Sequence, residues 1–165
     1  MLVLLTAAVA ATPTPDATAA LTGRWRLAEP RTVVQARVDA AVDATLAPFN
    51  AVIRGVARPL LGKAATFCDT YTTQLTTTSF TLSCDGAKAV TAVFGQPPVA
   101  GESAGRAYTL SGQFDGTGVV LDFLGEAGLQ RVRYTPGGSA FLVHKSIHAD
   151  KLDASVVWDM RYTRE

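Results

Sequence analysis

Two cysteines and two histidines are the residues of this chain whose types most often carry metal or redox chemistry. His144 and His148 share one face of a predicted strand, where a rise of ~3.3 Å per residue places them roughly 13 Å apart. Two ligands at that distance cannot hold one metal ion. No CxxC pair is present either. We therefore expect no metal site and no cofactor.

The motifs of common catalytic sites are missing from the sequence. There is no GxSxG, HExxH, P-loop or Rossmann fingerprint. Asp115 opens the turn signal DGTG (115–118), where aspartate bonds its own backbone. Asp122 alternates with apolar neighbours and is expected on an outer strand face, and no serine has an obvious base partner. We expect that the protein is not an enzyme.

The charge balance excludes a broad electrostatic surface for polyanions. The formal net charge is +1, and the arginines are scattered along the chain. Nucleic-acid-binding domains instead gather their basic residues on one face. We expect no nucleic-acid partner.

Cys68 and Cys84 are best explained as a disulfide. The segment 66–86 (TFCDTYTTQLTTTSFTLSCDG) has the alternation of a hairpin. A turn centred on Thr76 would place the two cysteines directly opposite each other, close enough for a bridge. Exported proteins with two cysteines commonly pair them. Two free buried thiols and a metal pair are the alternatives.

The N-terminus is typical of a secretory signal peptide. Residues 2–10 are a short apolar segment, and 8–10 and 17–19 are small-x-small cleavage sites. The apolar segment is too short to span a bilayer. The Pro- and Thr-rich stretch TPTPDAT (12–18) indicates a flexible linker. We expect signal peptide and linker over 1–20, one domain over 21–165 and a periplasmic or secreted location. A disordered apolar tail is the alternative.

Residues 31–61 carry a helical pattern. Apolar residues recur there at three- and four-residue spacing, which predicts amphipathic helix. Pro48 interrupts the pattern because proline removes a helical hydrogen bond. The pattern predicts two helices, roughly 31–46 and 48–60, the second ending near Pro59. One kinked helix is the alternative.

The rest of the chain alternates with period two. From Thr66 onward, turn signals recur every ~8–12 residues, which is typical of a sandwich or barrel. With a first strand at 22–27, we count about eight to ten strands, joined by short links that favour an antiparallel meander. The longest loop is GQPPVAGESAG (95–105). We predict a mainly β fold, a meander barrel with two helices between its first and second strands.

The stretch LTGRWRL (21–27) places Gly23 and Trp25 two apart on the first strand. A Gly-x-Trp on strand one before an antiparallel meander resembles the calycin superfamily of lipocalins and fatty-acid-binding proteins. The helical pair resembles the lid of the fatty-acid-binding branch. The resemblance implies that Trp25 plugs one barrel end and that Arg161 or Arg164 packs over it. The branch's Arg-x-Tyr carboxylate pair is matched poorly, because Arg161 and Tyr162 are adjacent.

Binding is the function that these features favour. A barrel of this strand number encloses one small ligand, and apolar rings line such pockets. We expect an exported, monomeric, lipocalin-like protein that binds a small hydrophobic or amphipathic ligand, fatty acid or lipid-like, with Tyr134, Tyr162 or Arg164 at its polar head. The alternative is a periplasmic interaction protein similar to protease or lysozyme inhibitors, with a filled barrel and loop 95–105 against a protein partner. The residues expected to bind a ligand are Phe80, Phe94, Tyr108, Phe123, Tyr134, Phe141, Trp158, Tyr162 and Arg164.

Overall fold

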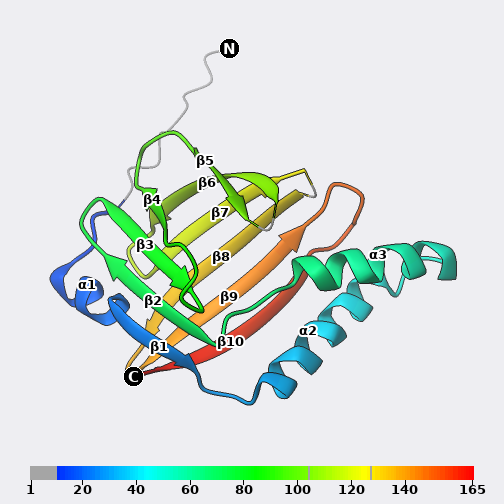
Figure 1. The fold of residues 1–165 in the computed structure, drawn as a ribbon, viewed down its shortest axis with the longest axis horizontal. Helices are drawn as coiled ribbons and strands as arrows, with labels where there is room; N and C mark the ends of the chain where they lie inside the picture. The colour runs from blue at the N-terminus through cyan, green and yellow to red at the C-terminus, as the bar shows by residue number, and fades with distance from the viewer. Residues whose placement is uncertain (1–10, 104, 127) are drawn as a thin grey trace, which may run out of the picture.

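The computed structural model describes residues 11–103, 105–126 and 128–165, and the predicted signal segment 2–10 lies outside them. Among these residues three helices and ten strands follow one another along the chain (Figure 1). In chain order they are α1 (Pro15–Leu21), β1 (Gly23–Leu27), α2 (Arg31–Leu46), α3 (Ala51–Ala64), β2 (Thr70–Leu75), β3 (Ser79–Cys84), β4 (Val90–Val93), β5 (Val99–Ser103), β6 (Arg106–Phe114), β7 (Val119–Gly125), β8 (Gly128–Gly137), β9 (Ala140–His148) and β10 (Val156–Arg164).

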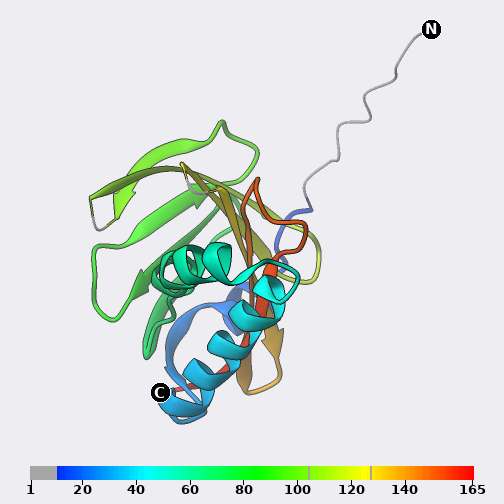
Figure 2. The ribbon, with the colours of Figure 1, turned by 90° about the vertical axis from the view of Figure 1, so that its right-hand side faces the viewer.

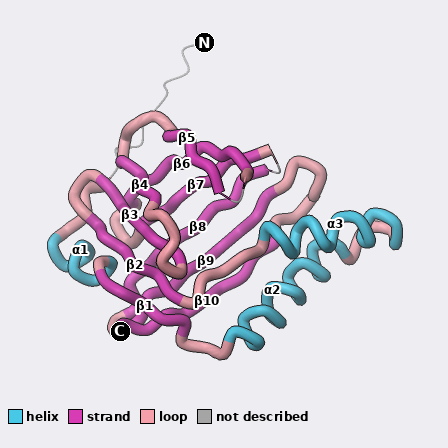
Figure 3. Tube along the Cα trace, in the orientation of Figure 1, coloured by secondary structure: helices cyan, strands magenta, loops and turns pink. Residues whose placement is uncertain are grey.

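The strands form one antiparallel sheet in the order β4-β3-β2-β1-β10-β9-β8-β7-β6-β5. Chain neighbours pair with each other, and β1 pairs with β10, so that the sheet curls into a barrel (Figure 3). β4 and β5 are the two edges of this sheet. The predicted antiparallel meander barrel is confirmed, and the barrel wall has one seam, between β4 and β5.

The hairpin β2–β3 has a different register from the predicted one. Leu75 pairs with Phe80, and the turn residues Thr76 and Ser79 hold each other through side-chain and backbone hydrogen bonds. The turn therefore centres beyond Thr76, and Cys68 lies before β2 rather than opposite Cys84. The disulfide Cys68–Cys84 nevertheless forms, with the two Cα atoms 5.5 Å apart.

The two helices predicted between the first two strands are present. Asn50 caps the start of α3 by accepting a hydrogen bond from the Ile53 amide at 3.0 Å. Pro59 does not end α3, which continues to Ala64. The carbonyl that Pro59 leaves without a partner belongs to Gly55, an exposed residue, so water can bond it.

Residues 15–21, expected to be part of a flexible linker, form the helix α1 instead. The side chain of Thr14 accepts a hydrogen bond from the Ala17 amide at 3.2 Å, and Pro15 occupies the first helical position that proline favours. Leu21 at the end of the helix is fully buried. This cap and this anchor residue order a stretch whose composition indicated a linker.

The predicted loop 95–105 contains the strand β5. It pairs with β6, with Val99 opposite Leu110 and Ser103 opposite Arg106. The residues of β5 are largely exposed because the strand forms a sheet edge. An exposed edge strand has no alternation of buried and exposed side chains, and therefore no pattern that identifies it in the sequence.

The barrel has two unlike ends. α1 and the C-terminus lie at one end, which we call the closed end (Figure 1). α2 and α3 lie together toward the other end, which we call the helix end (Figure 2). There α2 packs along β10, where Arg37 Nη1 donates to the Asp159 carbonyl at 2.7 Å and Thr45 Oγ1 to the Ser155 carbonyl at 3.3 Å. None of the helices described is long and apolar enough to cross a membrane.

Candidate functional site

Trp25 lies at the closed end, buried and facing inward. Its indole Nε1 donates to Thr73 Oγ1 at 2.9 Å, and its ring stacks on Phe141 with centroids 4.9 Å apart. The Arg164 guanidinium covers the outer side of the ring, with Cζ 4.7 Å from the centroid. A Cβ at Gly23 would lie 3.4 Å from Arg164 Cζ, so glycine keeps this space free for the guanidinium.

This arrangement distinguishes the two arginines that were expected as candidates to cover Trp25. Arg164 Nη2 donates to the Ala19 carbonyl at 2.9 Å, which holds the side chain against α1 and away from the barrel interior. Arg164 is therefore the one of the two candidate arginines that covers Trp25, and its role in ligand binding stays a prediction. Arg161, expected as one of two candidates to cover Trp25, is exposed on the outer face of β10.

Five of the rings expected to line a pocket are buried, and four of these pack against one another in a cluster, which we call the ring stack, through stacked, tilted and edge-to-face contacts. Tyr134 and Phe141 have centroids 5.4 Å apart, and Phe80 and Tyr134 5.2 Å apart. Tyr71, which was not predicted from the sequence, joins the stack 5.0 Å from Tyr162. The buried members from the expected set are Phe80, Tyr134, Phe141, Trp158 and Tyr162. The stack fills the closed-end half of the barrel.

The hydroxyl of Tyr162 does not point into open space. It donates to the Cys68 carbonyl at 2.8 Å. Burial raises the pKa values of Tyr71, Tyr134 and Tyr162, so these phenols stay neutral at physiological pH. Tyr162 is committed to the fold, and the expectation that it orients a ligand head has no support in this contact.

The other three rings of the expected set lie half-buried near the seam between β4 and β5. Tyr108 and Phe123 meet edge to face with centroids 5.5 Å apart, and Phe94 packs on the core from the end of β4. Beside them a groove of about 210 Å³ opens between the two edge strands. Its walls are residues 88–91, 99–102, Tyr108 and Leu110. The seam is therefore a gap in the wall, and Tyr108 is the one of these three rings that lines it.

Lys145 and Trp158 are a buried polar pair at the helix end. They are directly opposed on β9 and β10, two residue pairs in from the last pair, Ile147 and Val156. Lys145 is 5% exposed and Trp158 2% exposed. Lys145 Nζ donates to the Thr66 carbonyl at 2.9 Å, and burial lowers the pKa of Lys145 to about 8. Trp158 Nε1 is buried without a hydrogen-bond partner among the described residues.

Lys145 was not among the residues selected from the sequence, although the signal was present. Phe141, Val143 and Ile147 were expected to face inward, and Lys145 shares their parity on the same strand. A lysine in the middle of an inward-facing apolar set is rare, since charged side chains are seldom fully buried. Within the described chain it is the one buried charged residue.

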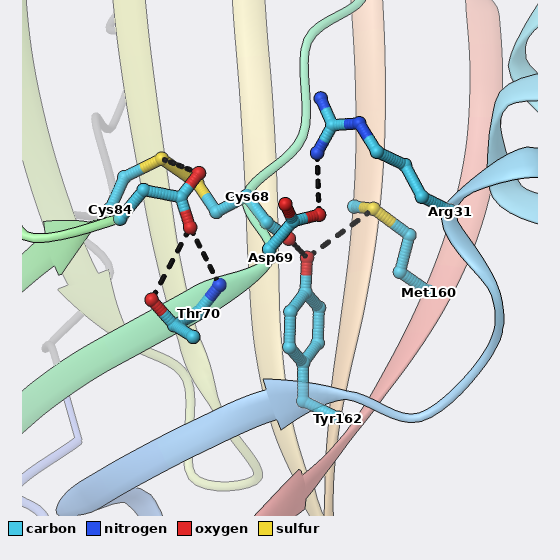
Figure 4. Close-up of polar contacts among 8 residues, drawn as sticks. Arg31, Cys68, Asp69, Thr70, Cys84, Met160 and Tyr162 are labelled. Carbon is cyan, nitrogen blue, oxygen red and sulfur yellow. Dashed lines mark hydrogen bonds and ion pairs between the residues drawn. A yellow bond between two sulfur atoms is a disulfide. The ribbon is translucent and has the colours of Figure 1, made fainter.

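Residues 66–69, which we call the strap, connect α3 to β2 above this pair. The strap is held from inside by Lys145 at Thr66 and by Tyr162 at Cys68. The disulfide and an ion pair between Arg31 and Asp69, 2.5 Å apart, hold it from outside (Figure 4). The strap thus bonds the Lys145 ammonium and links the end of α3 to the barrel.

Three possible metal ligands lie close together in the part of the chain that the structure describes. The ligand atoms of Cys68, Cys84 and Asp85 lie within 4.8 Å of one another, but both sulfurs are in the disulfide. His144 pairs with Asp159 at 2.6 Å on the exposed outer face. His148, also exposed, lies 3.4 Å from Ser155 Oγ.

The sequence matches no family model and no curated protein. The structure is similar to the REP1-NXSQ fatty acid transporter, with a TM-score of 0.55 at 15% identity over 87% of this chain and 95% of that chain. A Schistosoma mansoni fatty acid binding protein in complex with arachidonic acid gives 0.55 at 12% identity, covering 90% and 98%. A secretary abundant heat soluble protein from Ramazzottius varieornatus gives 0.57 at 8% identity, covering 88% and 96%. The chain therefore shares the barrel fold of these proteins, which is the fold that the sequence predicted.

Proposed function

We propose that this protein binds a small hydrophobic or amphipathic molecule, such as a fatty acid or a similar lipid, in the helix-end half of its barrel. The observation that carries this proposal is the groove at the seam. Tyr108 lines this groove and contacts the half-buried Phe123 behind it, whereas the rings of the other half are packed together and covered. Apolar side chains around a concave opening are the usual features of small-molecule sites.

The structural neighbours support a binding role over a catalytic one. Two of them are described as a fatty acid transporter and a fatty acid binding protein. α3 is the natural lid, because it adds a single buried side chain, Leu61, to the core and leaves Val52, Val56 and Leu60 exposed. Elements with few buried contacts open most easily.

An exported location belongs to the same proposal. The disulfide Cys68–Cys84 is of a kind that persists in oxidising compartments. The apolar segment 2–10 precedes the domain in the manner of a signal peptide. The mature protein then acts as a monomeric periplasmic or secreted carrier.

The proposal is tested by native mass spectrometry of protein purified from its own source, followed by organic extraction and uptake of a fluorescent fatty acid. A stoichiometric bound lipid, or saturable uptake of the probe, is the expected result. A protein that carries no added mass and takes up no probe contradicts the proposal.

A matched pair of variants locates the site. Phe123→Ala removes a half-buried inward ring, and we expect probe affinity to fall about tenfold, the loss of about 1.4 kcal/mol of apolar contact. Leu124→Ala is the control, because Leu124 is the next residue on the same strand and is 56% exposed on the opposite face. Equal affinities for the two variants would exclude the seam as the site.

The filled closed-end half favours a second candidate function. The ring stack around Phe141 leaves that half solid, as expected of a barrel that acts through its surface. A periplasmic protein that binds or inhibits another protein would have this property. Absence of ligand uptake by a correctly folded protein supports this second function.

A further inference from the structure

Two buried side chains with nitrogen donors, Lys145 and Trp158, have fewer hydrogen-bond acceptors among the described residues than they need. Lys145 and Trp158 are directly opposed across β9 and β10, and side chains in such positions have Cβ atoms ~5 Å apart. The ammonium of Lys145 has three donors and one protein partner, the Thr66 carbonyl. The indole N–H of Trp158 has none among the described residues.

The surroundings of the pair supply no counter-charge. Lys145 forms no ion pair within the described chain, and its flanking residue on β8 is Val132. Burial is the cause of its lowered pKa. A buried cation without an anion and a buried N–H without an acceptor are each costly to a fold. Together they provide an incomplete site that one acceptor group would complete.

A purely structural role for Lys145 does not explain its buried charge or the unpaired indole of Trp158. The bond to Thr66 ties down the strap, which a neutral donor would also do. It does not account for the charge, and it does not involve Trp158. A methionine or leucine at position 145 would fill the same space without the cost of burying a charge.

We infer that the Lys145 ammonium and the Trp158 indole N–H together bind the carboxylate head of an amphipathic ligand, an assignment that rests on the proposed binding function. One carboxylate carries a single negative charge and two acceptor oxygens, which match one cation and one neutral donor. A phosphate group would bring more charge than this pair neutralises. The apolar chain of the ligand then runs toward the half-buried rings of Tyr108 and Phe123.

This site differs in position from the Arg-x-Tyr arrangement that the sequence matched poorly. Arg161 is exposed on the outer face, and Tyr162 is bonded to Cys68. Met160 occupies the inward position two residues before Tyr162 and is buried. Among the described residues the buried cation of this barrel is Lys145 on β9.

The test compares two ligands of equal chain length, decanoate and 1-decanol, by titration calorimetry at pH 7. Wild type is expected to bind decanoate at least tenfold more tightly than the alcohol. Lys145→Met is expected to lose about tenfold in decanoate affinity and to keep its affinity for the alcohol. Trp158→Phe, which keeps an aromatic ring, is expected to lose several-fold in decanoate affinity and to keep its affinity for the alcohol.

Three controls keep the result interpretable. Lys151→Met removes the same charge from the exposed turn before β10 and is expected to leave both affinities unchanged. Lys145→Arg keeps the positive charge, so this variant is expected to bind decanoate more tightly than 1-decanol, as wild type does. Circular dichroism establishes that each variant is folded before it is titrated.

The outcomes separate this inference from the proposed function. If wild type binds neither decanoate nor 1-decanol, the proposed binding function fails. If it binds both equally and Lys145→Met changes neither affinity, the barrel binds ligands but the assignment of Lys145 and Trp158 is wrong. Acetate alone binding as tightly as decanoate also overturns the assignment, because the site would then hold a small anion without an apolar chain.

Discussion

Lys145 makes stability depend on pH in a narrow range. Its pKa is about 8 in the fold, compared with an ordinary value of 10.5. Between these values the unfolded chain binds more protons than the native chain, so the free energy of unfolding rises with pH. Below pH 8 the lysine is charged in both states and the cost of its burial is present in full.

The expected result is a gain on the order of 2 kcal/mol between pH 8 and pH 10 in wild type relative to Lys145→Met. Urea unfolding across this range measures it. The range ends near pH 10 because tyrosine side chains then lose protons in the unfolded chain, while Tyr71, Tyr134 and Tyr162 resist ionisation in the fold. Parallel stability curves for wild type and variant would show that Lys145 is not desolvated.

Gly112 marks the close approach of β6 to β4 at the seam. A Cβ at this position would lie 2.7 Å from the Ala92 Cβ and 2.8 Å from Leu121 Cδ2. Gly112→Ala is therefore expected to destabilise the protein by about 1–3 kcal/mol, as overpacking does. Thermal unfolding measures the change.

Gly62 is the matched control for this substitution. It lies in α3, where a Cβ would have no neighbouring side chain within 4 Å, so Gly62→Ala is expected to stabilise the helix by about 0.5–1 kcal/mol. Equal effects of the two substitutions would show that the seam is looser than the contacts of Gly112 imply.

At the scale of elements, the disulfide is one of the ties between the helical segment and the sheet. It joins the strap to the end of β3 and closes a loop between residues separated by 16 positions. Replacing both cysteines, Cys68→Ser with Cys84→Ser, is expected to lower the free energy of unfolding by about 2–4 kcal/mol. Urea unfolding gives the value.

Hydrogen exchange adds a local readout to this prediction. With the disulfide gone, the strap keeps its inner contacts to Lys145 and Tyr162. We expect the amides of residues 66–69 to exchange faster while those of β9 and β10 keep their protection. Unchanged exchange in the strap would mean that its inner contacts hold it without the disulfide.

The elements with strong periodicity were predictable from sequence, and the others were not. The pattern over 31–61 predicted α2 to the residue range observed, because Val34, Val38 and Val42 recur on one buried face. β5 was missed because an exposed edge strand shows no alternation. α1 was missed because its order comes from the cap at Thr14 and one buried residue, Leu21.

The hairpin shows a different limit of sequence reasoning. The pairing of Cys68 with Cys84 was right, but the register that motivated it was wrong. Alternation sets which face a side chain takes and does not set where the turn falls. The turn is fixed by the local hydrogen bonds of Thr76 and Ser79.

At the scale of the whole molecule, the two halves of the barrel differ. The closed-end half is filled by rings, whereas the helix-end half contains buried donors that lack acceptors among the described residues. The sequence does not distinguish the inward-facing rings of the two halves, because all of them occupy the same alternating positions along their strands. The difference arises from three-dimensional position: the closed end is covered by α1 and Arg164, and the helix end by α2, α3 and the strap. Only the structure separates the stacked rings from Tyr108 and Phe123.

The difference between the two halves also explains why the indole N–H groups of Trp25 and Trp158 differ in hydrogen bonding. Each is buried and faces inward, yet Trp25 Nε1 is bonded to Thr73 and Trp158 Nε1 has no partner within the described chain. The chain has two tryptophans, so its nitrogen-15 spectrum has two indole signals. The signal absent from Trp158→Phe identifies Trp158.

The most direct test of the account is to follow these two signals while decanoate is added to the wild-type protein. Formation of a charge-assisted hydrogen bond is expected to move the Trp158 indole proton downfield and to leave the Trp25 signal in place. A Trp158 signal that stays unchanged at saturating decanoate, or one that moves equally with 1-decanol, would contradict the central claim that this barrel binds the carboxylate of an amphipathic ligand.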